Sequence, residues 1–440
     1  MRIDLTAERG VTEAVAQRRN ENSAINRLQP EDRAVHDWYR FVLSFPPHLV
    51  RDYLARFGVD ERGCVLDPFC GTGTVLVEAK KLGIPSIGIE RAPMAQLASR
   101  VKVDWTPEPA ALVGHATCVA DAAVALLARE GNANASLRRL PPDTESLLLA
   151  GSISPLPLHK TLVLLQCLAE QRDERWDGHE RLALAKALVT SLGNLHFGPE
   201  VGVGPAKPDA PVIETWLQNV RSMAQDLEAV RGRRDVPAAV RLADSRSLHG
   251  VLTPRSITAV ITSPPYPNEK DYTRTTRLES VLLGFVRSKA ELRALKRDLV
   301  RSNTRGVYKD DNDDRWIATQ PQIERLVATI EARRIELGKT SGFERLYARV
   351  TSLYFGGMAR HLAELRPFLM PGARLAYVVG DQASYFRVQI RTGQLLGEIA
   401  WSLGYELVDI DLFRTRLATA TRAQLREEVV VLRWPGTAGR

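Results

Sequence analysis

The feature that most constrains the fold is a glycine-containing turn set between two short apolar segments. Residues 64–67 and 87–90 are mainly apolar and end on Asp67 and Glu90, and the turn Asp67-Pro-Phe-Cys-Gly-Thr-Gly-Thr74 leads into a helical pattern over residues 75–82. Apolar runs of this length bounded by Gly and Pro are typical of strands. A strand, a turn, a helix and a second strand predict a βαβ unit, which lies in a parallel sheet with helices packed against it.

Five further segments have strand character. They are rich in apolar and β-branched residues, and they lie at residues 239–244, 257–262, 374–379, 405–411 and 428–433. With the first two they make seven strands, and segments long enough for a crossover separate the first five. This pattern predicts an α/β fold built on a doubly wound, mainly parallel, seven-stranded Rossmann-like sheet with helices on both faces.

Two largely helical insertions interrupt the sheet, so we expect six parts along the chain. Residues 105–236 carry leucine- and alanine-rich helical patterns, broken by a Gly- and Pro-rich stretch at 197–211 that predicts a long loop. The expected parts are an N-terminal arm (1–37), the first part of the core (38–104) with a helix over 47–57, a helical insertion (105–236), the core with the catalytic segment (237–274), a basic helical insertion (275–340) and the C-terminal part of the core (341–440).

The glycine turn lies where a doubly wound sheet binds its ligand, at the carboxyl end of the first strand. Glu90 stands 17 residues after Gly73, near the offset of about 20 residues at which a carboxylate binds ribose hydroxyls. Leu76 replaces the third glycine of a dinucleotide fingerprint, and the turn has no P-loop lysine. These features favour a cofactor that contains adenosine without phosphates over NAD and ATP. A tight turn that binds nothing is the alternative.

A second motif, Thr262-Ser-Pro-Pro-Tyr266, directly follows the fourth predicted strand. Together with the glycine turn and Glu90, it resembles motifs I, II and IV of the S-adenosylmethionine-dependent DNA amino-methyltransferases. Ser44-Phe-Pro-Pro47 resembles motif X of that family and Ala243-Asp244 resembles motif III, while residues 380–392 and the region of Arg414 resemble the later motifs. The resemblance covers residues 40–104 and 236–435. It implies that the predicted seven-stranded sheet is the Rossmann-like sheet of a methyltransferase.

The resemblance implies S-adenosylmethionine as the cofactor. Asp67 would lie near its methionine ammonium, Glu90 would bind the ribose hydroxyls and Asp244 would bind the adenine amine. For Asp244, an ordinary turn residue at a strand end is the alternative. The expected cofactor-binding residues are Ser44, Phe45, Pro46, Asp67, Phe69, Gly71, Thr72, Gly73, Glu90 and Asp244.

The residues Ser263, Pro264, Pro265 and Tyr266 have the chemistry that methylation of an exocyclic amine requires. The lone pair of such an amine is delocalised into the base, so the amine is a poor nucleophile until acceptors hold its two N–H bonds out of the ring plane. The Ser263 hydroxyl and the Pro264 carbonyl are the candidate acceptors, and the prolines fix φ and preorganise that carbonyl. The Tyr266 ring can stack on the base.

The serine in this motif bears on which base is methylated. In the family that the chain resembles, serine at the first acceptor position accompanies N4-cytosine methylation more often than N6-adenine methylation. We therefore expect methylation of cytosine N4 in duplex DNA, on a base flipped out of the stack. N6-adenine methylation, methylation of an RNA base, and a catalytically silent protein that senses the cofactor remain alternatives.

Other base-modifying chemistries are disfavoured by missing motifs. Carbon-5 methylation needs a Pro-Cys nucleophile, and no cysteine of this chain follows a proline. A zinc deaminase needs H-x-E with P-C-x-x-C, which is also missing, and we expect no metal site.

A formal net charge of +8 favours a polyanionic partner. Basic residues outnumber acidic ones in the segment that follows the Ser-Pro-Pro-Tyr motif, which favours phosphate contacts there, although a solvated charged face is the alternative. The expected DNA-binding residues are Arg287, Lys289, Arg293, Lys296, Arg297 and Arg301, followed by Arg305 and Lys309. The acidic run at 310–314 has no role that the sequence suggests. Target recognition is expected in this insertion or in residues 105–236.

The chain carries no signal for export or membrane insertion that we recognise in its sequence. No apolar run approaches the roughly 18 to 20 residues needed to span a bilayer, and the first residues lack the apolar segment of a secretory signal. We expect a cytoplasmic protein with no membrane contact, with duplex DNA as substrate and a cognate restriction endonuclease as a candidate partner.

Overall fold

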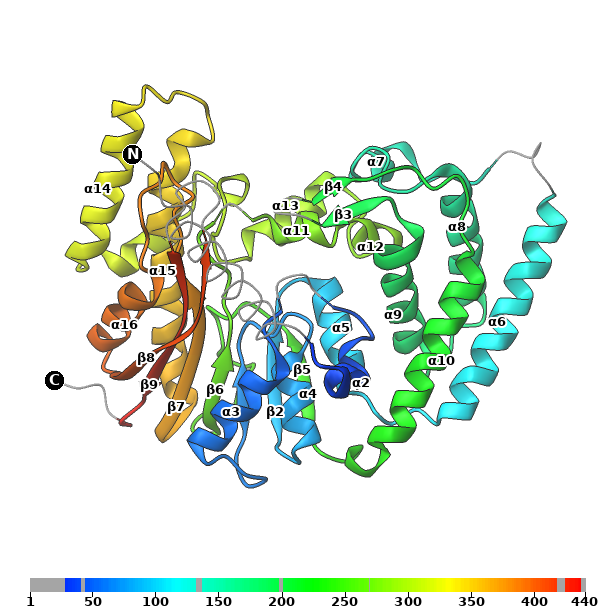
Figure 1. Ribbon diagram of the computed structural model, residues 1–440, viewed down its shortest axis with the longest axis horizontal. Coiled ribbons are helices and arrows are strands. Elements are labelled where there is room, and N and C mark those ends of the chain that lie inside the picture. The colour runs from blue at the N-terminus through cyan, green and yellow to red at the C-terminus, as the bar shows by residue number, and fades with distance from the viewer. Residues whose placement is uncertain are drawn as a thin grey trace, which may run out of the picture.

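Seven strands form one sheet in the computed structural model of the chain, which describes residues 28–40, 44–131, 137–197, 201–268, 270–417 and 424–436 (Figure 1). The strand order is β5-β2-β1-β6-β7-β9-β8, and all neighbours are parallel except the two pairs made by β9. The predicted doubly wound, mainly parallel sheet is confirmed. Its strands are β1 (Val65–Asp67), β2 (Ser86–Glu90), β5 (Ala238–Leu242), β6 (Ile257–Thr262), β7 (Leu369–Gly380), β8 (Glu406–Leu417) and β9 (Gln424–Arg433).

Alternate residues of the strands face two separate layers of helices, because successive side chains of a strand point to opposite faces. Val65 belongs to the apolar cluster that contains the buried residues of α4 and α5, whereas its neighbour Leu66 belongs to the cluster formed with α15. The first face is covered by α3 (Pro47–Phe57), α4 (Thr74–Lys81) and α5 (Pro93–Val103), and the second by α14 (Pro321–Glu336), α15 (Tyr347–Leu365) and α16 (Thr392–Ser402).

The first insertion forms a helical group beside the sheet, on the right of Figure 1. In α10 the buried residues Trp216, Val220, Met223 and Leu227 recur every three or four positions and form one apolar face, and the Trp216 ring N–H donates to the Glu180 carbonyl at 2.9 Å. Outside the two sheet layers the helices are α2 (Arg33–His36), α6 (Pro109–Glu130), α7 (Pro142–Glu145), α8 (Pro155–Glu170), α9 (Asp177–Ala187), α10 (Val212–Val230), α11 (Tyr272–Thr275), α12 (Arg277–Leu282) and α13 (Lys289–Arg297).

The prediction of a long loop at 197–211 is wrong in part. An antiparallel hairpin, β3 (Leu195–Phe197) with β4 (Val201–Val203), occupies its beginning, and irregular structure follows up to α10. The glycines and prolines of the stretch mask the strand signal, since only a few apolar residues form each strand. The hairpin pairs outside the main sheet and leaves the seven-stranded order unchanged.

The expected N-terminal arm packs against the rest of the protein where the structure describes it, from residue 28 onward. Val35 and Trp38 are buried, and the Trp38 ring N–H donates to Asp226 of α10 at 2.8 Å. His36 pairs with Glu78 of α4 at 2.8 Å. This segment therefore ties the helical insertion to the first face of the sheet, while residues 1–27 of the expected arm lie outside the described residues.

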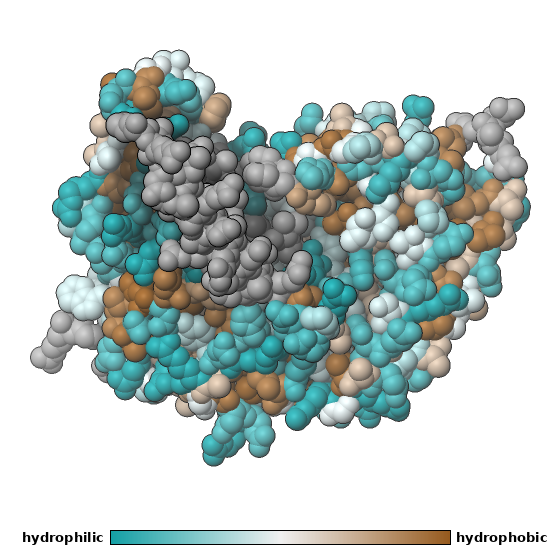
Figure 2. Space-filling view, viewed as in Figure 1, coloured by the Kyte–Doolittle hydropathy of each residue, from teal (hydrophilic) through white to brown (hydrophobic). Residues whose placement is uncertain are grey.

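Helix α6 is an exception to the expectation that no apolar run approaches the length needed to span a bilayer. By length and composition it is apolar enough to cross a membrane, with 28% of its most apolar window buried. Brown patches at the right edge of Figure 2, in the region of α6, show part of its apolar side, and Val124 is 53% exposed. A single helix of this kind is weak evidence for a membrane span. Helix α6 packs against α8 and α10, and its residues Leu112, Ala116 and Val119 are buried.

Candidate active site

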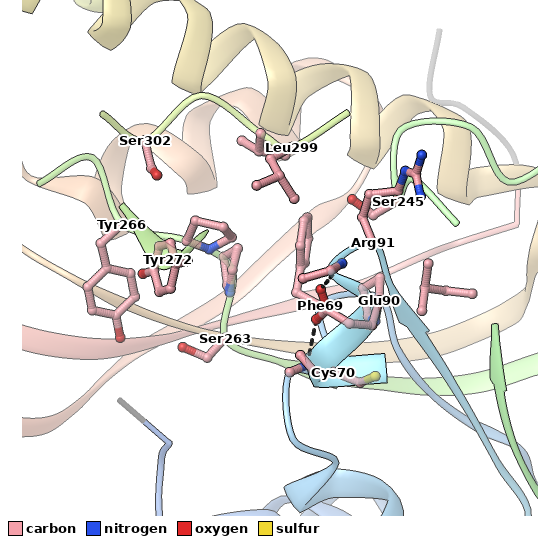
Figure 3. A pocket seen from close by; sticks show the side chains of 18 of the residues that line it. Phe69, Cys70, Glu90, Arg91, Ser245, Ser263, Tyr266, Tyr272, Leu299 and Ser302 are labelled. Atoms are coloured by element: carbon pink, nitrogen blue, oxygen red, sulfur yellow. Dashed lines mark hydrogen bonds between the residues drawn. The ribbon is translucent and has the colours of Figure 1, made fainter. Parts of the chain in front are cut away.

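A cavity of about 270 Å³ opens at the carboxyl ends of β1, β2, β5 and β6. Such a crevice is where doubly wound sheets bind ligands. Figure 3 shows Ser263, Tyr266 and Tyr272 toward one end of it and Phe69, Glu90 and Arg91 toward the other. The predicted site residues that line the cavity are Ser44, Phe45, Phe69, Gly71, Thr72, Glu90, Asp244, Ser263, Pro264, Pro265, Tyr266, Lys296 and Arg301.

The two glycines of the turn have different roles. Gly71 has φ +50°, lines the cavity, and leaves open space where a side chain would begin. Gly73 has φ +83° and precedes α4, and a Cβ there would lie 3.0 Å from the Ser99 Cβ and 3.1 Å from its Cα. Gly71 therefore gives a ligand access to the backbone, whereas Gly73 lets α4 approach α5 and lies outside the cavity wall.

The expected position of Asp67 beside the cofactor differs from what the structure shows. Its carboxylate is buried beneath the turn, where it accepts hydrogen bonds from the Thr262 hydroxyl at 2.6 Å and the Phe69 N–H at 3.2 Å. Burial raises the pKa of Asp67 to about 7, against the opposing effect of those hydrogen bonds. Asp67 thus braces the turn, and Pro46, which precedes the first turn of α3, likewise lies outside the cavity wall.

Glu90 lies at the end of β2 and lines the cavity. Its two carboxylate oxygens accept from the backbone N–H groups of Ala92 at 2.8 Å and Gly71 at 2.9 Å. Burial raises the pKa of Glu90 to about 7, while these N–H groups oppose the rise. A carboxylate held in this way can accept further hydrogen bonds from a ligand hydroxyl.

Asp244 is fixed by a buried arginine. Arg246 donates to both of its carboxylate oxygens, at 3.0 Å and 2.8 Å, and is itself 5% exposed. The other side of the Arg246 guanidinium pairs with Asp313 at 2.5 Å. A bidentate pair of this kind sets the orientation of a carboxylate, so Asp244 is presented to the cavity in one geometry.

The Ser-Pro-Pro-Tyr segment leaves β6 and forms the far end of the cavity. The Ser263 hydroxyl donates to the carbonyl of Val378 on β7 at 3.1 Å, so its oxygen presents lone pairs to a second donor. The Tyr266 ring is held close to β7, since a Cβ at Gly380 would lie 3.1 Å from the Tyr266 Cε2. Burial raises the pKa of Tyr266 above its ordinary value, so this phenol is neutral.

Several lining residues were missed by the sequence interpretation. They come from the residue after β2, from the segment after the motif, from residues 298–306 and from the last two strands. Asp271 and Tyr272 could have been suspected from their closeness to the motif, and the region of Arg414 resembles a later family motif, whereas the others carry no pattern in the sequence. They are Arg91, Asn268, Asp271, Tyr272, Leu299, Ser302, Asn303, Phe413, Arg414 and Glu427.

Two arginines of the basic stretch pair with the acidic run that follows it. Arg297 pairs with Asp310 at 2.7 Å, and Arg301, 5% exposed, pairs with Asp311 at 2.6 Å. Because a buried and paired guanidinium cannot reach a phosphate, the expected DNA contact by Arg301 is not supported. The expected residues that stay exposed are Arg287, Lys289, Arg293, Arg297, Arg305 and Lys309.

The donors and acceptors of the cavity suit an adenosine-containing cofactor. Phe69 offers a ring face, Gly71 an open backbone, and Glu90 and Asp244 two carboxylates at the ends of adjacent strands. Ser44 closes the wall near Thr72, with their hydroxyl oxygens 3.5 Å apart. These groups fit the ribose, adenine and amino-acid parts of S-adenosylmethionine.

A family model described as DNA methylase matches residues 13–98, which include the glycine turn and Glu90. Type II methyltransferase M.BsoBI from Geobacillus stearothermophilus is 26% identical over 92% of this chain and 85% of its own length. Type II methyltransferase M.AvaI from Nostoc sp. is 22% identical over 93% of this chain and 88% of its own length. Type II methyltransferase M.MjaII from Methanocaldococcus jannaschii is 37% identical over 18% of this chain and 15% of its own length.

Among solved structures, TrmN from Thermus thermophilus matches 91% of this chain and 52% of its own chain, at 12% identity and a TM-score of 0.31. Similarity of this degree does not establish a common fold. The sheet order and the cavity agree with these comparisons, and the family model and the Type II methyltransferase relatives support the assignment of the chain to the S-adenosylmethionine-dependent DNA amino-methyltransferases.

Proposed function

We propose that the chain methylates the exocyclic N4 of cytosine in duplex DNA at specific sites. The observation that carries this proposal is the position of Ser263, whose oxygen lines the same cavity as Glu90 and Asp244 while its proton is donated to Val378. A serine at this position favours cytosine over adenine in the family that the motif resembles. A neutral oxygen acceptor also suits an amine that must present its lone pair.

S-adenosylmethionine, when bound, supplies an electrophilic methyl group on a sulfonium. Ser263 Oγ and the Pro264 carbonyl would accept hydrogen bonds from the two N–H groups of the amine and direct its lone pair out of the base plane. Proline rings fix φ at Pro264 and Pro265, so the Pro264 carbonyl is in place before the base arrives. Positioning of the two reactants would provide most of the acceleration.

The target base must leave the duplex before it can reach this cavity. Flipping costs a few kcal/mol, and Tyr266 stacking on the base would return roughly 1–3 kcal/mol of that cost. The exposed cations Lys289 and Arg293 of α13, with Arg287 just before that helix, would neutralise phosphates beside the cavity. The surrounding helices of either insertion would read the recognition sequence.

We further propose that the chain is the modification component of a restriction-modification system, with a cognate endonuclease as partner and a cytoplasmic location; the Type II name of the relatives favours the first part of this proposal. In such a system, methylation would protect the host DNA at the recognition sequence.

Expression in a host without DNA methylation, followed by mass spectrometry of DNA and RNA nucleosides, tests the proposal. The expected product is 4-methylcytosine in DNA, at a strongly reduced level in cells that express the Tyr266→Ala variant. Finding 6-methyladenine in DNA would instead support the alternative target base. A modified RNA base with unmodified DNA would exclude both DNA activities.

A further inference from the structure

A buried ion pair lines the cavity beside the Ser-Pro-Pro-Tyr segment. The Lys296 ammonium of α13 lies 2.6 Å from Asp271 Oδ2, and the side chains are 14% and 6% exposed. Both residues line the cavity together with Tyr266 and Tyr272. Lys296 therefore does not stand on the outer surface with Lys289, although the two belong to one helix.

The pair is held in one place by its surroundings. Asp271 Oδ1 accepts from the backbone N–H of Thr273 at 3.1 Å and from its hydroxyl at 2.6 Å, which leaves Oδ2 for Lys296. Among the described residues, Asp271 is the one acceptor within hydrogen-bond distance of the Lys296 ammonium. An ammonium has three N–H donors, so Lys296 can still donate to a ligand in the cavity.

The target base needs such a donor. Ser263 and Pro264 supply acceptors for its amine, yet the rest of the Watson–Crick edge of cytosine, N3 and the O2 carbonyl, consists of acceptors. Adenine can be superposed on cytosine with its N6 amine on the N4 amine and its N1 on N3. In that superposition adenine has C2–H where cytosine has the O2 carbonyl. A donor aimed at that position would therefore favour cytosine and leave adenine without a partner.

We propose that Lys296, held by Asp271, is a specificity-determining residue that donates a hydrogen bond to O2 of the flipped cytosine. The inference rests on the proposed function, because it requires cytosine as the target. Asp271 keeps the pair neutral, which lowers the cost of a buried cation and offsets its repulsion of the positive charge that develops on the amine. Lys296 thus moves from an expected phosphate contact to a base contact.

Two other roles for the pair predict different behaviour. A purely structural pair would stabilise the fold and leave the preference for the base unchanged. A phosphate contact would strengthen binding to every duplex equally, whatever base occupies the target position. Probes that differ only at the target position separate these roles.

The test uses wild-type protein and duplexes that carry the recognition site found by sequencing the methylated DNA. One duplex has cytosine at the target position, one has an abasic residue, and one has an analogue that keeps the amine and ring nitrogen but lacks O2. For wild-type protein we expect kcat/KM on the analogue to be about 10- to 100-fold below that on cytosine, the range of a hydrogen bond to a charged group. Equal turnover of the two would overturn the proposal without any variant.

Lys296→Met should weaken binding to the cytosine duplex by about 10- to 100-fold while leaving binding to the abasic duplex unchanged. The matched variant Lys289→Met, on the exposed side of the same helix, should weaken binding to both duplexes equally. Equal effects of Lys296→Met on both duplexes, or no effect on either, would contradict the proposal. If wild-type protein methylates adenine or RNA, the proposed function itself fails, and that result is separate from the outcome for Lys296.

Discussion

Thr262 donates its hydroxyl proton to the Asp67 carboxylate across 2.6 Å, so the last residue of β6 is joined to the last residue of β1. The glycine turn begins after Asp67, and the Ser-Pro-Pro-Tyr segment begins after Thr262. This buried hydrogen bond, together with the parallel pairing of β1 and β6, joins the part of the cavity that suits the cofactor to the part that suits the base.

Loss of this bond should destabilise the fold. In Thr262→Val, Asp67 keeps only the Phe69 N–H as a donor in a buried position, and we expect the free energy of unfolding to fall by about 1–3 kcal/mol. Urea denaturation measures the change. Thr329→Val is the control, because its hydroxyl is exposed and donates within its own helix, and it should alter stability by less than about 0.5 kcal/mol.

The two glycines of the turn should respond differently to alanine. Gly73→Ala places a Cβ against Ser99 at a positive φ, so we expect a loss of thermal stability large enough to see in a melting curve. Gly71→Ala meets no neighbouring atom but narrows the cavity, so we expect weaker cofactor binding with a smaller loss of stability. Calorimetric titration with S-adenosylmethionine separates the two effects, and the reverse order would contradict these roles.

Cofactor affinity should depend on pH through Glu90. Burial raises its pKa to about 7, so the carboxyl is partly protonated near neutrality. Ribose hydroxyls that donate to Glu90 favour the ionised form and lower this pKa on binding. Affinity should therefore be highest above pH 7 and fall with decreasing pH below it, by up to about tenfold per pH unit.

The same linkage predicts that protons are released when the cofactor binds near pH 7. Calorimetry in two buffers of different ionisation enthalpy measures this release. In Glu90→Gln the release should disappear. Persistent release would assign the proton to another group, such as Asp67, whose pKa also lies at about 7.

Removal of the Tyr266 ring should separate catalysis from cofactor binding. In Tyr266→Ala we expect most turnover to be lost, because the base has no ring to stack on, while calorimetric binding of S-adenosylmethionine is retained. Loss of cofactor binding in this variant would show that Tyr266 belongs to the cofactor part of the cavity.

The strands were predictable because their apolar runs are short and separated by glycine, proline and helical patterns. The strand pattern also led to the prediction of Gly71, Glu90 and Ser263 as site residues, because each lies at or just after the end of a strand. Asp67 shows the limit of that reasoning. Its place at the end of β1 was correct, but the direction of its side chain depends on Thr262, 195 residues further on, which no local pattern encodes.

Counting charges along the sequence did not predict which basic residues are free to contact DNA, for a related reason. Arg301 and Asp311 form a buried pair because the chain folds back between them, whereas a linear count treats them as separate basic and acidic stretches. Lys296 is basic in sequence and faces the cavity in space, so its environment could be found only once α13 was placed beside Tyr272.

The most direct test of the central claim is to locate the transferred methyl group. Purified enzyme is incubated with S-adenosylmethionine carrying a deuterated methyl group and a duplex containing its recognition site, and the digested nucleosides are identified by tandem mass spectrometry against authentic standards. We predict the label on N4 of cytosine, with Tyr266→Ala strongly reduced. Label on N6 of adenine or on a ring atom of cytosine would contradict the account of Ser263 and Pro264 as acceptors for the cytosine amine.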